Sequence, residues 1–273
     1  MKFKYLGTAA YEGVPSLFCK CRVCTLARQK GGRNVRSRSQ ALLNDEILFD
    51  FNADTVSHYL KYGFDWEKIE GVLITHSHCD HLYPDDLEML KEGYSHAHRP
   101  LNVYSAKSGY EMMKEKLGDM SEDEIKIHLI EAGKRFTVGS YSVLPLRANH
   151  AEDTSPVIYS VTKGGKRMLY AHDTGVFFED TWEGLKSEGR YDFISFDCTG
   201  CLGRGWDWRN GHMSLKTNLE MIARMKGEKL IDDGTKIVVN HFSHNGGQTY
   251  DEMLEEAAKH GITVSYDGLE IDF

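Results

Sequence analysis

The chain has 273 residues, of which 41% are hydrophobic, and this apolar content excludes a disordered protein and suffices for a sizeable core. The formal net charge of −8 argues against a non-specific nucleic-acid-binding protein, because such proteins neutralise phosphates with a basic surface. No apolar run approaches the length of a membrane span, and residues 1–7 are too short to be a signal peptide. We therefore expect a cytoplasmic protein without a membrane partner.

In the first half of the chain, short apolar segments alternate with amphipathic ones. In chain order the predicted elements are strands at 2–6, 41–43 and 47–51, a helix at 55–62, a strand at 71–75, a helix that begins at Pro84, a strand at 101–104, a helix at 109–116 and a strand at 126–130. Asp54 is the expected N-cap of the first helix, because its carboxylate can accept amide protons of the first turn. Residues 10–38, rich in glycine, arginine and cysteine, predict a loop.

The second half of the chain adds hairpins to the same mixture. In chain order the predicted elements are two strands within 135–146, a hairpin of 157–161 and 167–171, a strand at 193–196, a helix at 215–225, a strand at 236–239, a helix at 250–259 and a final hairpin of 262–266 and 269–273. Glycine pairs and Asp-Gly, as at residues 164–165 and 267–268, are typical of hairpin turns. Strands and helices mix without a linker, so the sequence predicts one domain over 1–273, of layered α/β type with mixed sheets.

The strongest chemical signal directly follows the strand predicted at 71–75. Three imidazoles and one carboxylate lie within a few residues there, at His76, His78, Asp80 and His81. Imidazole and carboxylate are the usual ligands of zinc and similar divalent ions. His76 and His78 can point to one metal, and Asp80 and His81 to a second. A solvated polar loop is the alternative, but it does not account for this density of histidine.

This segment resembles the His-x-His-x-Asp-His signature of the metallo-β-lactamase superfamily. The resemblance implies a four-layer αββα sandwich with two metals at one edge and with further ligands that each follow a strand. His150 fits the third ligand of the first metal, Asp173 the bridging carboxylate, and His241 the last ligand of the second metal. His172 is expected to be structural, because it alternates to the opposite side of its strand from Asp173.

A second cluster, formed by Cys19, Cys21 and Cys24, suits a structural zinc that needs a fourth ligand, with a redox pair or unrelated thiols as alternatives. Together with the glycine-rich residues 7–15, it resembles a subgroup of the superfamily that includes the phosphoribosyl 1,2-cyclic phosphate phosphodiesterase of the carbon–phosphorus lyase pathway. That resemblance implies His244 as the fourth ligand. Cys79 is expected to pack inside, and the roles of Cys198 and Cys201 stay open.

His212, expected at the start of the helix over 215–225, resembles the histidine of the His-x-Ser/Thr motif of the same subgroup. It could bind a phosphoryl oxygen or protonate a leaving alkoxide, or it could be an ordinary histidine. A helix N-terminus disfavours a positive charge, so we expect an imidazole that is neutral at rest. Arg36 and Arg38 could contact phosphate, with a surface or structural role as the alternative.

These patterns predict a hydrolase with two divalent ions in the active site (zinc or manganese, with iron or nickel as alternatives) and one structural zinc. We expect a phosphodiesterase for small or cyclic phosphodiesters, in which Asp80 and Asp173 orient the nucleophile and His212 assists the leaving group. The alternatives are a ribonuclease of the transfer-RNA 3′-processing type, a lactonase or thioesterase of the same fold, and a non-enzymatic binding protein. Whether the chain forms a homodimer, and which substrate and metals it uses, stay open.

Overall fold

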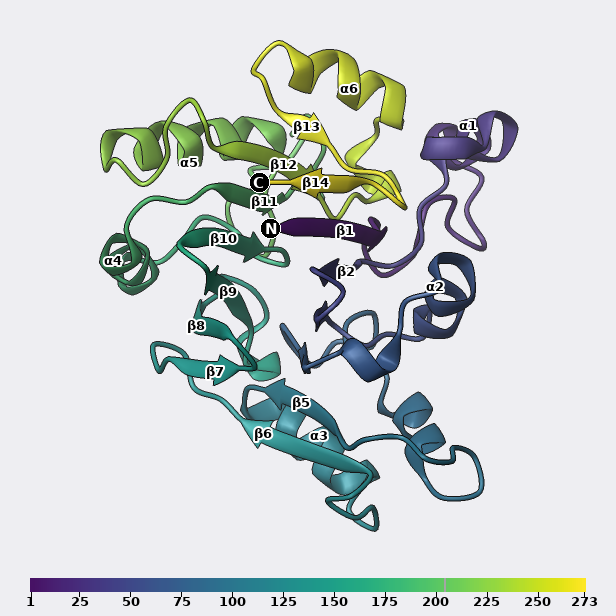
Figure 1. Ribbon diagram of the computed structural model, residues 1–273. Helices are drawn as coiled ribbons and strands as arrows, with labels where there is room; N and C mark the ends of the chain where they lie inside the picture. The colour runs from purple at the N-terminus through teal and green to yellow at the C-terminus, as the bar shows by residue number, and fades with distance from the viewer. Residues whose placement is uncertain (204) are drawn as a thin grey trace.

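The computed structural model describes residues 1–203 and 205–273. Two sheets of seven strands each pack face to face, and helices cover the outer face of both sheets (Figure 1). The predicted four-layer αββα sandwich with two mixed sheets is therefore confirmed.

The first sheet has the strand order β14-β1-β2-β3-β4-β5-β6 and becomes parallel from β3 to β6. Its strands are β1 (Lys2–Gly7), β2 (Gln40–Leu43), β3 (Ile47–Phe49), β4 (Gly71–Leu73), β5 (Leu101–Ser105), β6 (Ile125–Leu129) and β14 (Glu270–Asp272). The helices on its outer side are α2 (Thr55–Tyr62), α3 (Lys107–Lys116) and the 3-10 segment η3 (Pro84–Leu90). Leu48 and Val72 of the sheet and Met113 of α3 are fully buried in the core between them.

The second sheet has the order β13-β12-β11-β10-β9-β8-β7 and is parallel from β10 to β13. Its strands are β7 (Phe136–Val138), β8 (Tyr141–Arg147), β9 (Val157–Lys163), β10 (Lys166–Ala171), β11 (Phe193–Asp197), β12 (Lys236–Asn240) and β13 (Thr263–Val264). The helices on its outer side are α4 (Glu179–Glu188), α5 (Leu215–Gly227) and α6 (Tyr250–Ala258). Leu169, Trp182 and Met225 form part of the core between this sheet and its helices.

The core between the two sheets is rich in aromatic side chains. Phe3 and Phe49 of the first sheet meet Tyr170 and Phe193 of the second sheet, and all four are fully buried. The rings of Phe49 and Tyr170 are stacked, with 4.3 Å between their centroids. Because large buried rings dominate the energetics of a core, these contacts hold the sheets together and fix their relative position.

The helices are short, and α5 has 13 residues. Short 3-10 segments connect other elements, at η1 (Gly32–Asn34), η2 (Trp66–Lys68), η4 (Glu152–Thr154) and η5 (His244–Gly246). Among the described residues, no helix combines the length and the apolar character that crossing a bilayer requires. Asp54 is the N-cap residue of α2, as predicted, but its carboxylate accepts hydrogen bonds from Arg38 and none from the helix, so the expected side-chain cap is not formed. The helix predicted from Pro84 is a 3-10 helix.

Two helices were not expected from the sequence. The first, α1 (Arg22–Lys30), lies within the segment predicted as a loop, and it buries only Val23, Cys24 and Ala27. That apolar face is too short to stand out among charged neighbours. The second, α4, buries Trp182 and Leu185 one turn apart but is otherwise polar. For both helices, contacts with the rest of the fold outweigh a weak local pattern.

The final predicted hairpin is wrong, because its two strands lie in different sheets. β13 pairs with β12 in the second sheet, whereas β14 pairs with β1 in the first. The connection between them passes Asp267, whose half-buried carboxylate accepts hydrogen bonds from Thr8 Oγ1 at 2.6 Å and from the backbone nitrogen of Ser37 at 2.7 Å. The Asp-Gly pair therefore marks a crossing between sheets and not a tight turn.

Candidate metal centre

The loops after four strands carry polar side chains to one edge of the sandwich. β8, β10 and β12 run in the same direction, because β9 is antiparallel to both β8 and β10 while β10 to β12 are parallel. The loops after these strands carry His150, Asp173 and His241, and the loop after β4 in the other sheet carries residues 76–81. The structure brings all the predicted ligands together where the two sheets meet.

His76, His78 and His150 form the first group of ligand atoms. Nε2 of His76 lies 2.9 Å from Nδ1 of His78, and Nε2 of His150 lies 3.3 Å from the same Nδ1. Burial disfavours a charged imidazole, so it holds the pKa of His76 well below its ordinary value and also lowers the pKa of His150. Neutral imidazoles with converging ring nitrogens are the form in which histidine binds a metal.

Asp80, His81 and His241 form the second group. Nε2 of His81 lies 3.3 Å from Oδ2 of Asp80 and 3.3 Å from Nε2 of His241. The carboxylate of Asp173 lies between the two groups. Its Oδ2 is 3.0 Å from Nε2 of His81 and 2.9 Å from Nε2 of His241. Its Oδ1 is 3.7 Å from Nε2 of His150, so Asp173 is placed to bridge both groups.

The chemistry of this donor set fits divalent cations. Oδ2 of Asp173 is buried without a well-aligned hydrogen-bond donor among the described residues, although ring nitrogens of His81 and His241 lie close to it. Burial by itself would raise the pKa of Asp173, but His241 and His81 hold it well below its ordinary value. A buried carboxylate that stays charged is paired or coordinates a metal. One cation for each group, with Asp173 between them, meets this requirement.

Asp50 supports the second ligand group by contacting the side of the His81 ring that faces away from the other ligands. No ligand-like pattern in the sequence indicated this residue. Its Oδ2 accepts a hydrogen bond from Nδ1 of His81 at 2.7 Å, which leaves Nε2 of His81 to face the other ligands. Its Oδ1 accepts from the backbone nitrogen and from Oγ1 of Thr75, at 2.7 and 2.9 Å. A carboxylate behind a histidine ligand fixes the ring orientation and increases its basicity. The only sequence signal was an acidic residue within the apolar segment 47–51.

Asp197, at the end of β11, organises the other side of the centre and was also not predicted. Its buried carboxylate accepts hydrogen bonds from the backbone nitrogens of Asp173, Thr199 and Met213, at 3.1, 3.0 and 2.9 Å. Oγ1 of Thr199 lies 2.9 Å from Nδ1 of His241, the ring nitrogen that faces away from the ligand group. Asp197 therefore fixes the backbone of one ligand and, through Thr199, the ring of another.

Asp197 also holds His212, whose Nδ1 lies 2.9 Å from Oδ2 of the carboxylate. His212 lies two residues before Ser214, the N-cap of α5. Its ring is stacked on that of His241, with 5.6 Å between the centroids. Burial opposes protonation of this imidazole, but the Asp197 carboxylate outweighs that effect and raises the pKa of His212 to about 9. The expectation of a neutral His212 is therefore wrong, because a buried carboxylate at hydrogen-bond distance outweighs a nearby helix terminus.

These groups open into a cleft of about 530 Å³. Its lining residues are Ala10, Tyr11, Glu12, His78, Cys79, Asp80, His150, Asp173, Thr199, Trp208, His212, His241, Ser243 and Asn245. Cys79 is exposed and lines the cleft, so the expectation that it packs inside is wrong. None of the described lining residues is a lysine or an arginine.

Arg36 and Arg38, which could have contacted phosphate, lie elsewhere in the fold. Arg36 is buried, and its Nη1 donates to Oγ1 of Thr8 and to the backbone oxygen of Ser265, both at 2.8 Å. Arg38 donates from Nη1 to the carboxylate of Asp54 at 3.1 Å. Neither arginine lines the cleft, and their contacts assign both to holding the segments around it.

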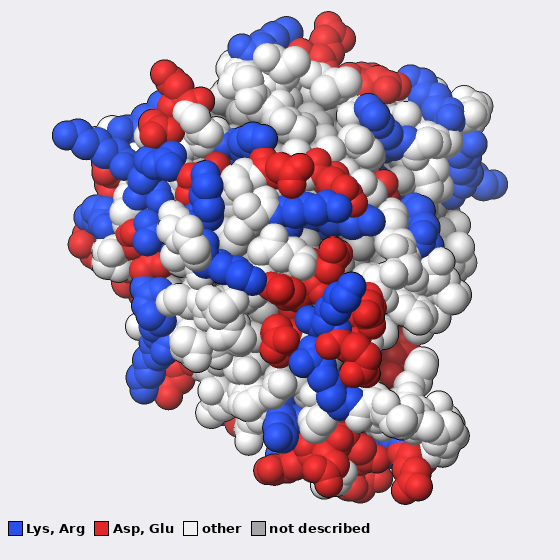
Figure 2. Space-filling view, in the orientation of Figure 1, with Lys and Arg blue, Asp and Glu red and all other residues white. Residues whose placement is uncertain are grey.

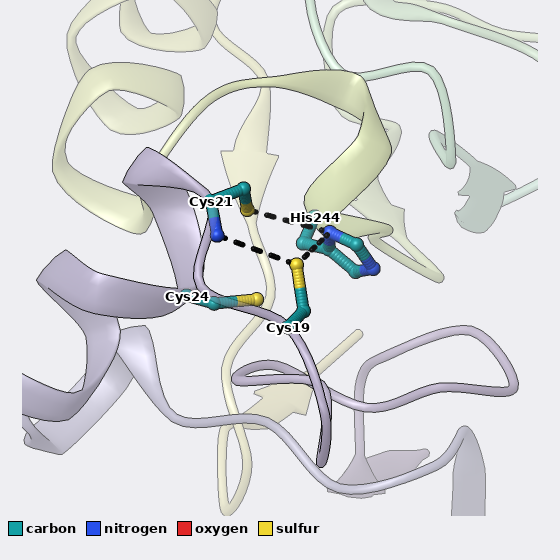
Figure 3. Close-up of side chains that lie close together, drawn as sticks. All are labelled: Cys19, Cys21, Cys24 and His244. Carbon is teal, nitrogen blue, oxygen red and sulfur yellow. Dashed lines mark hydrogen bonds between the residues drawn. The ribbon is translucent and has the colours of Figure 1, made fainter.

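The side chains of Cys19, Cys21, Cys24 and His244 converge into a separate group (Figure 3). Nδ1 of His244 lies 3.5 Å from Sγ of Cys21 and 3.7 Å from Sγ of Cys19. Burial works against ionisation of Cys21, but hydrogen bonds from the Cys24 amide and from His244 lower the pKa of this thiol to about 7. Three thiols and one imidazole within ligand distance suit a closed, four-coordinate zinc site.

Other histidines and cysteines have structural surroundings. Nε2 of His172 lies 2.7 Å from Oγ of Ser195, and the ring is buried between the sheets, as the sequence suggested. Cys198 and Cys201 are buried, and burial raises the pKa of both thiols. Neither cysteine belongs to a group of possible metal ligands among the described residues. These side chains therefore pack and do not extend the centre.

The model of a family described as "Beta-lactamase superfamily domain" matches residues 47–232. This chain belongs to the metallo-β-lactamase superfamily. That fold implies the use of divalent metals, and it assigns the chain to the hydrolases of the superfamily.

Relatives within the superfamily differ in their names. Coenzyme PQQ synthesis protein B of Methylorubrum extorquens is 26% identical over 98% of this chain and 98% of its own length. The Zn²⁺-bound crystal structure of PqqB from Methylobacterium extorquens covers 100% of both chains, with a TM-score of 0.78 and 23% identity. A diphosphatase of the PhnP family covers 100% of this chain and 97% of its own, with a TM-score of 0.75 and 20% identity. An octanoyltransferase of Porphyromonas gingivalis is 27% identical over 99% of this chain, which spans only 51% of that protein.

The contacts of Asp50 lead to a prediction about metal affinity. Asp50→Asn keeps the side-chain shape and suits the positive φ of 66° at this residue, but it removes the charge behind His81. We expect the affinity for one of the two metals to fall by about 10–100-fold, the range for loss of a partner behind a ligand. Titration of the metal-depleted protein with Zn²⁺ or Mn²⁺ against a competing chelator measures this change.

The control for that titration is Asp45→Asn, at an exposed turn residue with a φ of 58°. This variant should bind both metals as tightly as the wild-type chain. Wild-type affinity in Asp50→Asn would contradict the supporting role of Asp50.

The cysteine group leads to a prediction about stability. Cys21→Ser should remove one metal ion per chain and lower the free energy of unfolding by about 3–5 kcal/mol, because a structural metal contributes directly to folding. Metal content by elemental analysis and unfolding by denaturant measure the two effects. Cys198→Ala, outside the group, should keep the wild-type metal content. A wild-type chain with no metal beyond the catalytic pair would show that these thiols have another role.

Proposed function

We propose that this protein is a metal-dependent phosphodiesterase that acts on small or cyclic phosphodiesters. The observation that carries the proposal is the pair of His212 and Asp197: His212 lines the cleft beside the two ligand groups, and the buried Asp197 holds its ring from behind. Because Nδ1 of His212 is engaged by Asp197, Nε2 is the ring nitrogen available to a substrate. A histidine held in this way can donate a proton to the oxygen that leaves phosphorus.

The proposed metal ligands are His76, His78 and His150 for the first ion, Asp80, His81 and His241 for the second, and Asp173 for both. Two divalent ions at such a centre, with zinc or manganese as first candidates and iron or nickel as alternatives, supply Lewis acidity and lower the pKa of a water molecule. The carboxylates of Asp80 and Asp173 border the cleft and can accept a hydrogen bond from the attacking water, which orients it toward phosphorus. His212 then donates a proton to the leaving group.

The size and the charge of the molecule support a small substrate. A cleft of about 530 Å³ lies within the usual range for small-molecule sites. The formal net charge is −8, and basic and acidic side chains are interspersed over the one face shown in Figure 2, whereas proteins that bind polynucleotides usually have a basic surface. The ribonuclease alternative therefore receives less support. A lactonase or a thioesterase would have no evident need for the Asp197–His212 pair, although the metal ligands alone would serve either reaction.

Substrate profiling tests this proposal. The chain is reconstituted with Zn²⁺ or Mn²⁺ and assayed with linear and cyclic phosphodiesters, a lactone, a thioester and a short RNA. We expect turnover of the small phosphodiesters, because the cleft pairs a two-metal centre with a proton donor. Strong lactonase or thioesterase turnover without phosphodiester cleavage would reject the proposal.

Replacement of His212 tests its role. His212→Ala should keep both metals, since the ligand groups are complete without this residue, and should lower the rate by about 10²–10⁴-fold for diesters with a poor leaving group. The loss should be much smaller for a nitrophenyl diester, because nitrophenolate leaves without a proton. Rates with the two kinds of diester, together with metal analysis, measure this difference. Equal losses would favour phosphate binding over proton donation, and loss of metal would make His212 a ligand.

A further inference from the structure

One side of the cleft is formed by residues that the metal chemistry does not use. Tyr11 and Glu12, from the turn before α1, and Ser243 and Asn245, from the segment after β12, line the cleft together with the metal ligands. We infer that Glu12 selects the uncleaved part of the substrate, favouring a group that donates hydrogen bonds and excluding a second negative charge. This inference rests on the proposed phosphodiesterase function and adds the class of substrate.

The side-chain contacts of Glu12 fix its carboxylate. Oε1 accepts a hydrogen bond from Oγ of Ser243. Nδ2 of Asn245 and Nε2 of His244 each lie 3.5 Å from the same oxygen. Among the described residues these contacts all involve Oε1, which leaves Oε2 to meet a ligand. The carboxylate is thus an oriented acceptor and not a mobile surface charge.

Backbone contacts fix Glu12 relative to the metal ligand His241. The backbone nitrogen of Ala10 donates to the oxygen of Phe242 at 3.0 Å, and the nitrogen of Phe242 donates to the oxygen of Thr8 at 2.9 Å. The turn that carries Glu12 is therefore joined to the residue directly after His241. Glu12 and the metal ligands line the same cleft, and the position of Glu12 is fixed. The uncleaved end of a substrate that binds at the metals therefore lies in a cleft that also presents the Glu12 carboxylate.

The carboxylate of Glu12 determines which chemical group at the uncleaved end of the substrate fits the cleft. Glu12 has a side chain that is 23% exposed, so a ligand can reach it while water screens it only in part. A carboxylate accepts hydrogen bonds from hydroxyl or ammonium groups and repels a phosphate or another carboxylate. No lysine or arginine is found among the described lining residues, and the cationic His212 is assigned to the leaving group, so neither offsets this repulsion at the uncleaved end. The cleft therefore suits a diester with a single negative charge.

Aromatic rings complete this part of the cleft. Trp208 packs on Gly200, where a Cβ atom would lie 2.3 Å from the indole ring, so the ring has a fixed position. Tyr11 is 57% exposed and offers a second ring. The faces of such rings bind the apolar body of a small molecule and attract cations more than anions. Their presence agrees with the selection assigned to Glu12.

The test uses the metal-loaded, full-length chain and a series of p-nitrophenyl phosphodiesters. The second ester arm ends in a hydroxyl, an ammonium or a carboxylate group, on alkyl arms of graded length, so that the leaving group is the same throughout. For the wild-type chain, kcat/KM of the hydroxyl and ammonium diesters should exceed that of the carboxylate diester by about tenfold or more, the order expected for like charges in a partly screened site. Glu12→Gln keeps the shape and an acceptor oxygen but removes the charge. This variant should raise kcat/KM of the carboxylate diester until it lies within about threefold of kcat/KM of the hydroxyl and ammonium diesters.

Glu122→Gln, at an exposed residue that does not line the cleft, is the matched control and should keep the wild-type preference. Calorimetric binding of non-hydrolysable phosphonate analogues with the same three arms gives a second readout that needs no turnover, and thermal unfolding verifies that Glu12→Gln is folded. Cleavage of all three diesters with equal efficiency, or an unchanged preference in Glu12→Gln, would overturn the inference and leave the phosphodiesterase proposal standing. No cleavage combined with a Glu12-dependent order of binding would overturn the phosphodiesterase proposal and support the inference. The absence of both cleavage and binding preference would overturn both.

Discussion

Asp173 lies among imidazoles that two different sheets supply, and the arrangement of the whole edge depends on this contact. His81 comes from the loop after β4 in the first sheet and His241 from the loop after β12 in the second, and both direct Nε2 at the same carboxylate oxygen. Without a cation, the three buried carboxylates of Asp50, Asp80 and Asp173 repel one another, and mainly these histidines offset the repulsion. Metal binding at this edge therefore relieves an electrostatic cost and also links the two sheets.

The backbone at the edge shows how strongly the fold constrains the ligands. Asp50, Asp173 and His241 have φ values of 66°, 49° and 63°, a left-handed conformation that side-chain-bearing residues seldom adopt. Such a conformation persists only where surrounding contacts fix it. Here the hydrogen bonds to Asp197 and Thr75 do so. Three residues that meet the metals or support their ligands thus share this rare conformation, although other described residues, such as Asn44 and Ser155, also adopt it.

The short segment from His241 to Asn245 joins three features that lie apart in the sequence. His241 belongs to a group of possible metal ligands, His244 to the cysteine group, and Ser243 and Asn245 contact Glu12 in the lining of the cleft. A structural change at the cysteine group would therefore move a short backbone segment that also contributes to the metal centre and to the substrate end of the cleft. Relatives that share this fold carry unrelated names, as expected when one fold hosts different functions.

The sequence by itself determined the chemistry of the centre. The close spacing of His76, His78, Asp80 and His81 after an apolar strand is a local pattern, so it predicted the ligand-bearing loop. The resemblance that this pattern carries implied His150, Asp173 and His241, and their places after predicted strands agreed with it. The layered fold followed from the mixture of strands and helices and from the resemblance that the histidine pattern carries. The resemblance to a subgroup of the superfamily also implied His244 as the partner of three cysteines, and the structure brings these four side chains together.

Only the tertiary structure decided which side chains support the ligands and which border the substrate. Asp50, Asp197 and Glu12 are single acidic residues without a local pattern, and their partners lie 31, 15 and 231 residues away along the chain. The charge of His212 was misjudged for the same reason, because Asp197 reaches it only in the folded chain. The last hairpin likewise separated into two sheets, since strand pairing depends on distant neighbours that a turn motif does not reveal. Local spacing fixes which ligands a chain can offer, whereas contacts between distant segments fix their charge, their orientation and the substrate they meet.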